Sequence, residues 1–532
     1  MGDIEIGSAL PAKTNLVLAT NGAEIKKHPN GNGNGDGNGV EAVNKGYNAR
    51  EFLSDRAKIT QIDGIRGLMA VEGPGIVSFS SSCSAVSVLI RPSIAHFPPT
   101  LCLHQPAPLE ELETQSTDPH ATSAAGRPNP TTFPFSSITL NLKSPLDGSS
   151  NGDGNGQAES ITIDTEDLDI ALQYSPSPGL AKLVKWAVDL QSHVHNKKKD
   201  ESWTVSFGSG SQDMMAKAFH TLLNPGDPVL LETPVYSGVL PPLRLLGAEM
   251  IEVDVDEKGG SAKNLEKILS EWPEGKKRPR VLYTSPVGNN PSGCSAPRER
   301  KLEILEVCKK YNVLIFEGEQ YIDELMLVID YLATELIPSY FELETEVYPE
   351  AGHVVRFDSF SKLLSAGLRL GFATGPKEIT QAIDVLTAGA NLHTSGVSQA
   401  VALRLMQHWG VDGFLAHGRS VAKLYAERRA EFEKVAHKYL DGLATSVSPV
   451  AGMFLWVDLS PSGIKDSYEL IRHEALAKGV LGVPGMAFYP SGRKSPHVRL
   501  SFSIVDLEQD TELGFQRLAE AIKDKQKALG LA

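Results

Sequence analysis

Residues 358–371 read Asp-Ser-Phe-Ser-Lys-Leu-Leu-Ser-Ala-Gly-Leu-Arg-Leu-Gly and follow a short apolar run that predicts a strand. Within this stretch, Ser359 and Ser361 carry hydroxyls that donate to phosphate oxygens, and the planar guanidinium of Arg369 binds such oxygens in pairs. Lys362 carries an amine that forms an imine with an aldehyde. A Ser-x-Ser-Lys tetrapeptide alone is common in solvated turns. The whole run therefore carries the prediction of a phosphate site beside a reactive lysine.

Short apolar runs and stretches of helical apolar spacing alternate along the chain around this segment. They predict strands at 229–231, 281–283, 313–316 and 354–357, and helices at 180–195, 211–223 and 296–310. This alternation is typical of a mainly parallel sheet covered by helices, an α/β fold. Two further helices and two further strands are expected at 398–409, 421–439, 453–457 and 498–502. They predict a smaller α/β domain at the C-terminus.

The domain organisation follows from length and composition. The chain has 532 residues, 41% of them hydrophobic, which is enough to build more than one domain. Its Gly- and Asn-rich start, residues 1–46, is expected to be disordered because it cannot bury enough apolar surface. We expect an N-terminal arm at 47–79, a large domain at 125–395 and a small C-terminal domain at 396–532. Residues 80–124 are predicted to be an insertion. This insertion is either a real part of the protein or an unspliced intron that was translated into the sequence.

Charge and cysteine usage narrow the classes of partner. The net charge of −14 and the lack of a Lys/Arg-rich stripe argue against nucleic acid and anionic membranes, so we expect small-molecule substrates. The sequence contains no run of about 20 apolar residues, so no membrane-spanning helix is predicted. The four cysteines lack the spacing of a zinc site or a disulfide framework; they are Cys83, Cys102, Cys294 and Cys308. We therefore expect a cytoplasmic protein without a metal.

Two more motifs have the chemistry to hold a phosphorylated ring. Phe207-Gly-Ser-Gly-Ser-Gln212 follows a strand-like run and opens a helix, so backbone N–H groups in this turn can bind phosphate at the positive helix end. The same pattern is also typical of a plain helix cap. Tyr236 follows a strand, where it either stacks on a planar ring or packs under a loop.

Two polar residues later in the chain are candidates for a substrate site. Asn290 precedes a proline just after a predicted strand, so its amide either projects into a cleft or belongs to a plain turn. Arg499 ends the run Ser495-Pro-His-Val-Arg499. An arginine that points inward there binds a carboxylate through two hydrogen bonds, whereas an outward one forms a surface salt bridge.

Taken together and in this order, six segments resemble the fold-type I aminotransferases that depend on pyridoxal phosphate (PLP). The resemblance is nearest to the branch with kynurenine/2-aminoadipate and fungal aromatic amino-acid aminotransferases, and it runs from about residue 126 to 525. The segments are 127–135, 172–179, 288–293, 359–371, 451–456 and 499–503. The resemblance implies a large domain with a mainly parallel, helix-covered sheet and a smaller α/β C-terminal domain.

The resemblance also implies a role for each candidate residue. Lys362 would be the Schiff-base lysine that moves the substrate proton, and Tyr236 would stack on the pyridine ring. Asn290 and Tyr321 would contact the 3-oxygen of that ring. Arg499 would bind the α-carboxylate of the substrate, which Asn290 would also contact. The phosphate would be held by Ser211, Gln212, Ser359, Ser361 and Arg369.

The implied activity moves an amino group from an L-amino acid to a 2-oxo acid such as 2-oxoglutarate, by a ping-pong route. Because the family builds its sites across a dimer interface, the resemblance implies a homodimer in which Tyr174 reaches the phosphate of the neighbouring subunit. Aromatic amino acids, kynurenine and 2-aminoadipate are all compatible donors, in primary or in secondary metabolism.

The sequence departs from the family at the residue that pairs with the pyridine nitrogen. Family members carry an aspartate there, whereas this chain reads Glu317-Gly-Glu-Gln-Tyr-Ile322, with Gly318 at that position. Neighbouring side chains on a strand end point to opposite faces. Neither Glu317 nor Glu319 therefore replaces the aspartate without a shift of the backbone.

This departure keeps two other functions open. Asp323 and Asp330 are alternative partners only if the alignment contains a gap, and residues 318–335 are expected to be disturbed by divergence or by faulty exon joining. One alternative function is an enzyme of the same fold with lyase or condensing chemistry. The other is a weakly active PLP-binding protein.

Overall fold

The computed structural model describes residues 77–78, 127–143, 159–318, 337–348 and 352–531. By its internal contacts the chain divides after Phe52, and all of these residues belong to the second unit, Leu53–Ala532. The segment expected to be disordered (1–46), the expected insertion (80–124) and Tyr321 lie outside the described residues. The domain boundaries inferred from the sequence stay predictions.

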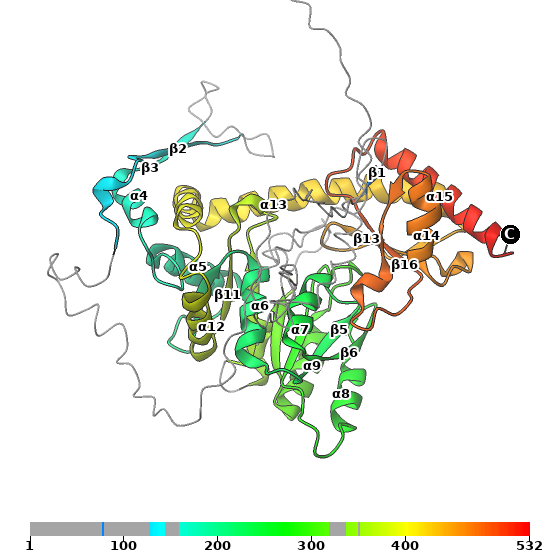
Figure 1. Cartoon of the computed structure of the whole chain (residues 1–532), viewed down its shortest axis with the longest axis horizontal. Coiled ribbons are helices and arrows are strands. Elements are labelled where there is room, and N and C mark those ends of the chain that lie inside the picture. Colours follow the sequence, from blue (N-terminus) through cyan, green and yellow to red (C-terminus); the bar gives the residue numbers. More distant parts are fainter. Residues whose placement is uncertain (1–76, 79–126, 144–158, 319–336, 349–351, 532) are drawn as a thin grey trace, which may run out of the picture. The chain divides into compact units, whose positions relative to one another are not determined.

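An eight-stranded sheet carries the strand ends at which the sequence places the site (Figure 1). Its strands are β4 (Trp203–Gly208), β5 (Pro228–Thr233), β6 (Glu249–Asp256), β7 (Gly259–Gly260), β8 (Val281–Thr284), β9 (Leu314–Gly318), β10 (Val354–Ser359) and β11 (Gly371–Pro376). They lie in the order β4-β11-β10-β9-β8-β5-β6-β7. The block from β10 to β6 is parallel, whereas β11 and β7 run antiparallel to their neighbours. The expected mainly parallel sheet is confirmed.

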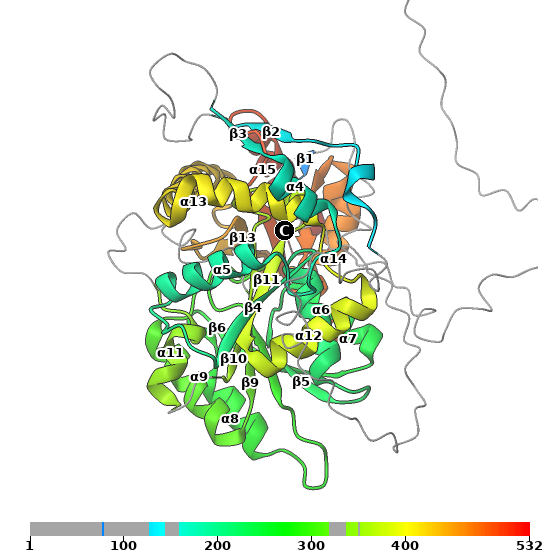
Figure 2. The ribbon, with the colours of Figure 1, turned by 90° about the vertical axis from the view of Figure 1, so that its left-hand side faces the viewer.

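Each face of this sheet packs against its own set of helices (Figure 2). The first face packs against α5 (Ala181–Val194), α8 (Ala262–Ser270), α9 (Arg298–Tyr311) and α11 (Tyr340–Val347). The second face packs against α6 (Ser211–Leu222), α7 (Leu240–Leu246) and α12 (Lys377–Ala390). Consecutive strand residues alternate between the two, so Leu282 belongs to the first face and Tyr283 to the second. This alternation decides which side chains at a strand end can meet.

The helix ends follow capping chemistry. The hydroxyls of Ser261 and Ser339 accept the backbone N–H three residues later, at the starts of α8 and α11. Helix α9 begins after Pro297 and ends at Asn312, whose φ of 55° is left-handed. These two stops explain why α9 covers Arg298–Tyr311 rather than the expected 296–310.

The long element α13 (Gly396–Leu440) consists of two helices that meet at a kink. The sequence predicts two helices, at 398–409 and 421–439. The first ends as predicted, at Gly410, whereas the second begins directly after Gly410 rather than at 421. Gly410 has φ 64° and ψ −176°, a conformation that glycine adopts readily. The helix therefore resumes directly after the kink and buries Phe414.

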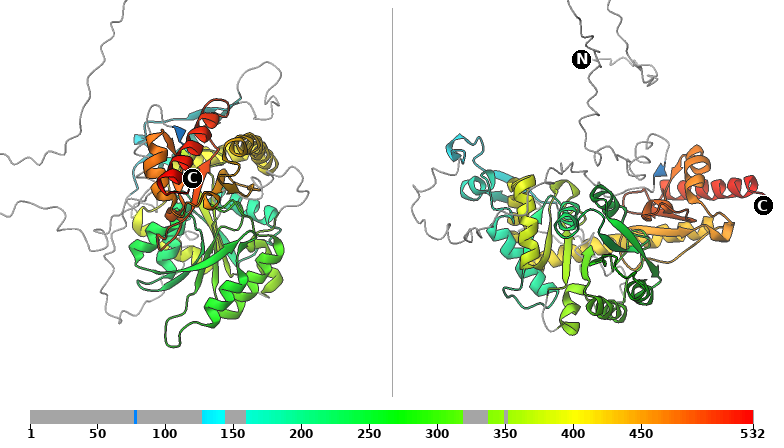
Figure 3. Two further views of the ribbon diagram at one scale, coloured as in Figure 1. Left: turned by 90° about the vertical axis from the view of Figure 1, so that its right-hand side faces the viewer. Right: turned by 60° about the horizontal axis from the view of Figure 1, so that its bottom comes forward.

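A second sheet and two short ribbons complete the described fold. The second sheet has the antiparallel order β12 (Thr445–Ser446), β13 (Phe454–Asp458), β16 (His497–Ser501) and β15 (Val483–Pro484). It lies in the same segment as α14 (Ser467–Leu470) and α15 (Asp510–Ala528), and α15 packs beside α13 (Figure 3). The ribbons pair β1 (Val77–Ser78) with β14 (Val480–Leu481), and β2 (Ile138–Asn141) with β3 (Ser160–Ile163), which is followed by α4 (Thr165–Leu172).

Candidate active site

The candidate site residues follow the carboxyl ends of parallel strands. Tyr236 follows β5, Asn290 follows β8 and Lys362 follows β10. These strands belong to the consecutive block β10-β9-β8-β5, so their loops leave the sheet along one edge. In open α/β sheets, ligands bind at this edge.

The start of α6 and the guanidinium of Arg369 lie together and form one side of a polar cup whose groups could hold a phosphate, here called the phosphate cup. Helix α6 begins at Ser211, and the first N–H groups of a helix have no acceptor within it. Arg369 Nη2 donates to the carbonyl oxygen of Ser209 at 3.2 Å. A Cβ atom at Gly210 would lie 2.7 Å from Arg369 Nη2, and the φ of 98° favours glycine there as well. The helix end and the cation therefore attract an anion to the same place.

The serines of the lysine-bearing segment reach the same cup. Ser359 pairs with Gly371 across β10 and β11, and a Cβ atom at Gly371 would lie 2.5 Å from the backbone nitrogen of Ser211. The backbone N–H of Ser361 donates to Ser359 Oγ at 3.2 Å. Lys362 comes next, half-buried in the turn. The serines predicted to bind a phosphate and the amine of Lys362 are thus carried by adjacent parts of one segment.

Gln212 and Tyr236 extend the cup towards the next strand loop. Gln212 Nε2 donates to the carbonyl oxygen of Gly238 at 2.6 Å, which joins the first turn of α6 to the loop after β5. Tyr236 is buried in that loop. A Cβ atom at Gly238 would overlap the Tyr236 ring, so this glycine allows the ring to lie close against the backbone. The aromatic ring is thereby fixed beside the helix end.

Arg499 and Asn290 form a second polar centre. Arg499 Nη1 donates to Asn290 Oδ1 at 2.8 Å, and only 1% of Arg499 is exposed. Its guanidinium carbon lies 4.0 Å from the ring centroid of Phe454 and 5.1 Å from that of Phe488. Such burial excludes the surface salt bridge that the sequence left open. Two aromatic rings fix the plane of the guanidinium, and a fixed plane suits the binding of a carboxylate through two hydrogen bonds.

Comparison with known proteins adds the family. Residues 157–514 match the family described as "Aminotransferase class I and II". The chain belongs to the class I and II aminotransferases. Aminotransferase tdiD of Emericella nidulans is 40% identical over 396 residues, which are 74% of this chain and 87% of the relative. The mitochondrial kynurenine/alpha-aminoadipate aminotransferase of Bos taurus is 38% identical over 414 residues, 75% of this chain and 91% of the relative.

A solved structure supports the same assignment. LysN, an alpha-aminoadipate aminotransferase from Thermus thermophilus complexed with N-(5'-phosphopyridoxyl)-L-leucine, is 30% identical to this aminotransferase. It superposes with a TM-score of 0.59, and the match covers 68% of this chain and 86% of LysN. This aminotransferase is a PLP-dependent transferase of fold type I. Its cup of helix N–H groups, serines and Arg369 fits the phosphate of PLP, and the turn beside the cup carries Lys362.

In this aminotransferase, the side chain of Glu317 points to the first face of the sheet and binds the start of α11. Glu317 is fully buried, and its carboxylate accepts the backbone N–H groups of Tyr340 at 2.8 Å and Phe341 at 3.2 Å. Its Oε2 also lies 3.6 Å from Nη1 of Arg356. Glu317 therefore caps α11 and points away from the second face, on which Gly318 lies. Glu319, Asp323 and Asp330 lie outside the described residues.

Glu317→Ala is expected to lower the free energy of unfolding by about 2–6 kcal/mol, because it leaves two buried helix N–H groups without an acceptor, at about 1–3 kcal/mol each. The buried Arg356 keeps its closer partner, Asp358, at 3.0 Å. The measurement is the urea midpoint of the purified protein. Glu303→Ala is the matched control, since Glu303 is 61% exposed and pairs with Arg300 at 3.2 Å. An exposed pair of this kind contributes about 1 kcal/mol or less. Equal losses in the two variants would contradict the capping role.

The described part of the structure does not place two of the predicted residues, Tyr174 and Tyr321, in the site. Tyr321 lies outside the described residues, and Tyr174 is 54% exposed with its ring edge against His393. Conversely, the structure adds Phe454, Phe488 and Tyr283, which the residue-by-residue reading of the sequence did not single out. Phe454 stood inside a resembling segment, whereas the contact of Tyr283 with Gly318 joins two strands and has no local sequence signal.

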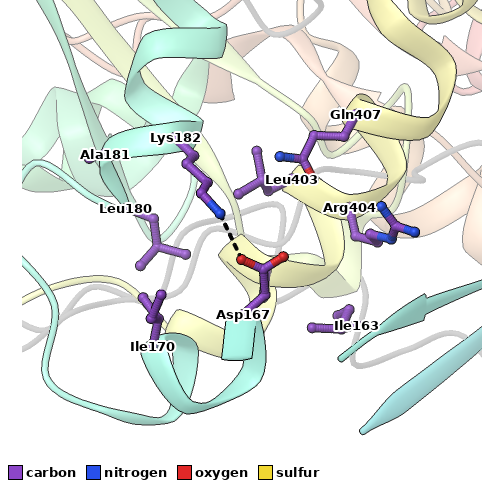
Figure 4. A pocket seen from close by; sticks show the side chains of 10 residues that line it. Ile163, Asp167, Ile170, Leu180, Ala181, Lys182, Leu403, Arg404 and Gln407 are labelled. Atoms are coloured by element: carbon purple, nitrogen blue, oxygen red, sulfur yellow. Dashed lines mark hydrogen bonds and ion pairs between the residues drawn. The ribbon is translucent and has the colours of Figure 1, made fainter. Parts of the chain in front are cut away.

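A separate pocket lies between α4, α5 and α13 (Figure 4). It is lined mostly by apolar side chains, among them Ile170, Leu180 and Leu403, and the ion pair of Lys182 with Asp167 at 2.9 Å lies at its wall. None of the candidate site residues lines it. It therefore takes no part in the site described above.

Proposed function

We propose that this aminotransferase moves the amino group of an L-amino acid with an aromatic, kynurenine-like or 2-aminoadipate-like side chain to a 2-oxo acid such as 2-oxoglutarate. The observation that carries the proposal is the buried Arg499–Asn290 pair, clamped by Phe454 and Phe488, at the same sheet edge as the phosphate cup. Amino donor and 2-oxo acceptor share one feature, the α-carboxylate. A single fixed arginine therefore serves both halves of the reaction.

The remaining residues take roles around the cofactor. PLP, when bound, supplies the aldehyde and accepts the electrons released at the substrate α-carbon. Lys362 would hold the cofactor through its aldehyde, and its amine would move the proton at the substrate α-carbon. Tyr236 would lie against the ring, and Asn290 would contact its 3-oxygen and the substrate. Tyr321, which the family resemblance assigns to the 3-oxygen, lies outside the described residues. The phosphate would be held by Ser211, Gln212, Ser359, Ser361 and Arg369.

The proposed substrates rest on the relatives. The bovine relative is named for kynurenine and alpha-aminoadipate, and a relative of Schizosaccharomyces pombe that is 32% identical is named an aromatic amino acid aminotransferase. The clamp around Arg499 is compatible with all of these donors because it fixes only the carboxylate. The side chain of the donor is selected elsewhere in the site.

We also propose a cytoplasmic homodimer. The ring of Tyr174 is exposed and lies outside the phosphate cup of its own subunit. It is therefore available to reach the phosphate of a neighbouring subunit. The scattered cysteines agree with a reducing compartment. The described residues contain no helix that is both long and apolar enough to cross a membrane.

The test is a panel of amino donors incubated with PLP-loaded protein, with and without 2-oxoglutarate. We expect 2-oxo acid and glutamate to form together from aromatic donors, kynurenine or 2-aminoadipate, and only when 2-oxoglutarate is present. Double-reciprocal plots at several acceptor concentrations should be parallel, as a ping-pong route requires. Product that forms from the donor alone would contradict the proposal and favour lyase or condensing chemistry. If PLP-loaded protein converts no donor, the result would contradict the proposal and favour the alternative of a weakly active PLP-binding protein.

A further inference from the structure

The place of the missing aspartate is filled from the neighbouring strand. Tyr283 on β8 pairs with Phe316 on β9, and both belong to the second face; Gly318, two residues on, lies on that face as well. A Cβ atom at Gly318 would lie 2.5 Å from Tyr283 Oη and 2.6 Å from its Cε2. The phenol therefore occupies the point at which a side chain of residue 318 would begin.

The hydroxyl of Tyr283 is buried and has no hydrogen-bond partner among the described residues. The side chain is fully buried, and its Oη has no hydrogen bond to any of the described residues. An unsatisfied buried hydroxyl costs about 1–3 kcal/mol, so a ligand atom that accepts its proton would remove that cost. Burial raises the pKa of Tyr283 well above its ordinary value, and nearby Tyr236 and Glu232 raise it further. At neutral pH the group is thus a neutral O–H donor beside the ring-stacking tyrosine.

We propose that Tyr283 Oη takes the place of the missing carboxylate and donates a hydrogen bond to the pyridine nitrogen of PLP. This inference rests on the proposed function, because it requires PLP bound with its nitrogen towards the end of β9. A neutral phenol keeps its own proton and leaves the nitrogen unprotonated. An aspartate would instead stabilise the protonated, positively charged nitrogen.

This arrangement changes what the cofactor contributes. A ring whose nitrogen is unprotonated accepts electrons less readily than a protonated one. Removal of the α-proton then depends more on the placement of Lys362 and Arg499 than in family members with the aspartate. The aminotransferase should be slow in comparison with them while it keeps its cofactor well bound.

Carboxylates are the competing partners. Glu317 is engaged on the first face by α11 and Arg356. The remaining acids nearby in sequence, Glu319, Asp323 and Asp330, lie outside the described residues. A carboxylate would protonate the nitrogen, whereas the phenol would not, so the protonation state separates the two.

The experiment loads wild-type protein, Tyr283→Phe and Tyr340→Phe with PLP labelled with ¹⁵N in the ring, and records the ¹⁵N resonance. Tyr340→Phe is the matched control, because Tyr340 is also fully buried without a hydrogen bond to its Oη but belongs to the first face. We expect an unprotonated, hydrogen-bonded nitrogen in wild type and in Tyr340→Phe. In Tyr283→Phe the resonance should move towards that of a free pyridine, and PLP affinity should fall about 2- to 12-fold.

The other outcomes contradict the inference. A protonated nitrogen in wild type would assign the role to a carboxylate, and a resonance that Tyr283→Phe leaves unchanged would exclude the phenol. Thermal unfolding of the three proteins checks that each retains its fold. Protein that takes up no PLP would overturn the proposed function itself, whereas loaded protein with a protonated nitrogen would overturn only the role of Tyr283.

Discussion

Lys362→Ala is expected to lower the rate of amino transfer by about 10⁴-fold or more, because the variant loses the attachment point of the cofactor and the positioned base together. Lys362 lies half-buried in the turn after β10, and its amine has no hydrogen bond or ion pair with other described residues. Its removal should therefore leave thermal unfolding unchanged. The measurement is 2-oxo acid formation from a saturating donor, with PLP in excess.

The control for this prediction is Lys423→Ala, which removes an exposed lysine of α13. A second readout is independent of turnover. Borohydride reduction of wild type should fix the cofactor to the peptide that contains Lys362, and peptide mapping should find no adduct in Lys362→Ala. An adduct on another lysine, or a variant that turns over at the wild-type rate, would refute the assignment.

Much of the fold is predictable from the sequence because the parallel sheet is buried on both faces. Its strands therefore read as short apolar runs, and the predicted strand at 354–357 falls within β10. In α13, the two predicted helices are present, but the second one begins earlier than predicted. It begins directly after Gly410 rather than at 421, and it buries Phe414 in the first turn after the kink.

The site is predictable where one segment carries its chemistry. Ser359, Ser361 and Arg369 lie within a few residues of Lys362, and β-pairing brings them to the start of α6. Contacts between strands cannot be predicted from the sequence in the same way, because the register between strands is set by tertiary structure. Glu317 and Gly318 were correctly expected to point to opposite faces. That Tyr283 fills the space beside Gly318 depends on how β8 and β9 align, which no local pattern encodes.

Arg499→Lys is expected to lower kcat/KM for the amino donor by about 100- to 1,000-fold, because truncating a buried charge pair costs about 3–4 kcal/mol. Lysine keeps the charge, but it cannot bridge two carboxylate oxygens and cannot lie flat between Phe454 and Phe488. It would also lose the hydrogen bond that Arg499 donates to Asn290. PLP affinity should be unchanged, since Arg499 is not part of the phosphate cup.

The loss should extend to both halves of the reaction, because donor and acceptor each present an α-carboxylate to the same arginine. Single-turnover rates measured first with amino acid and then with 2-oxo acid should therefore fall together. Arg493→Lys is the control, as Arg493 is 52% exposed and lies 3.6 Å from Glu252. The decisive comparison uses an amine that lacks the carboxylate. If Arg499→Lys slowed that amine as much as the amino acid, the arginine would act by supporting the fold, whereas a loss confined to the carboxylate-bearing substrate would mean that it binds substrate.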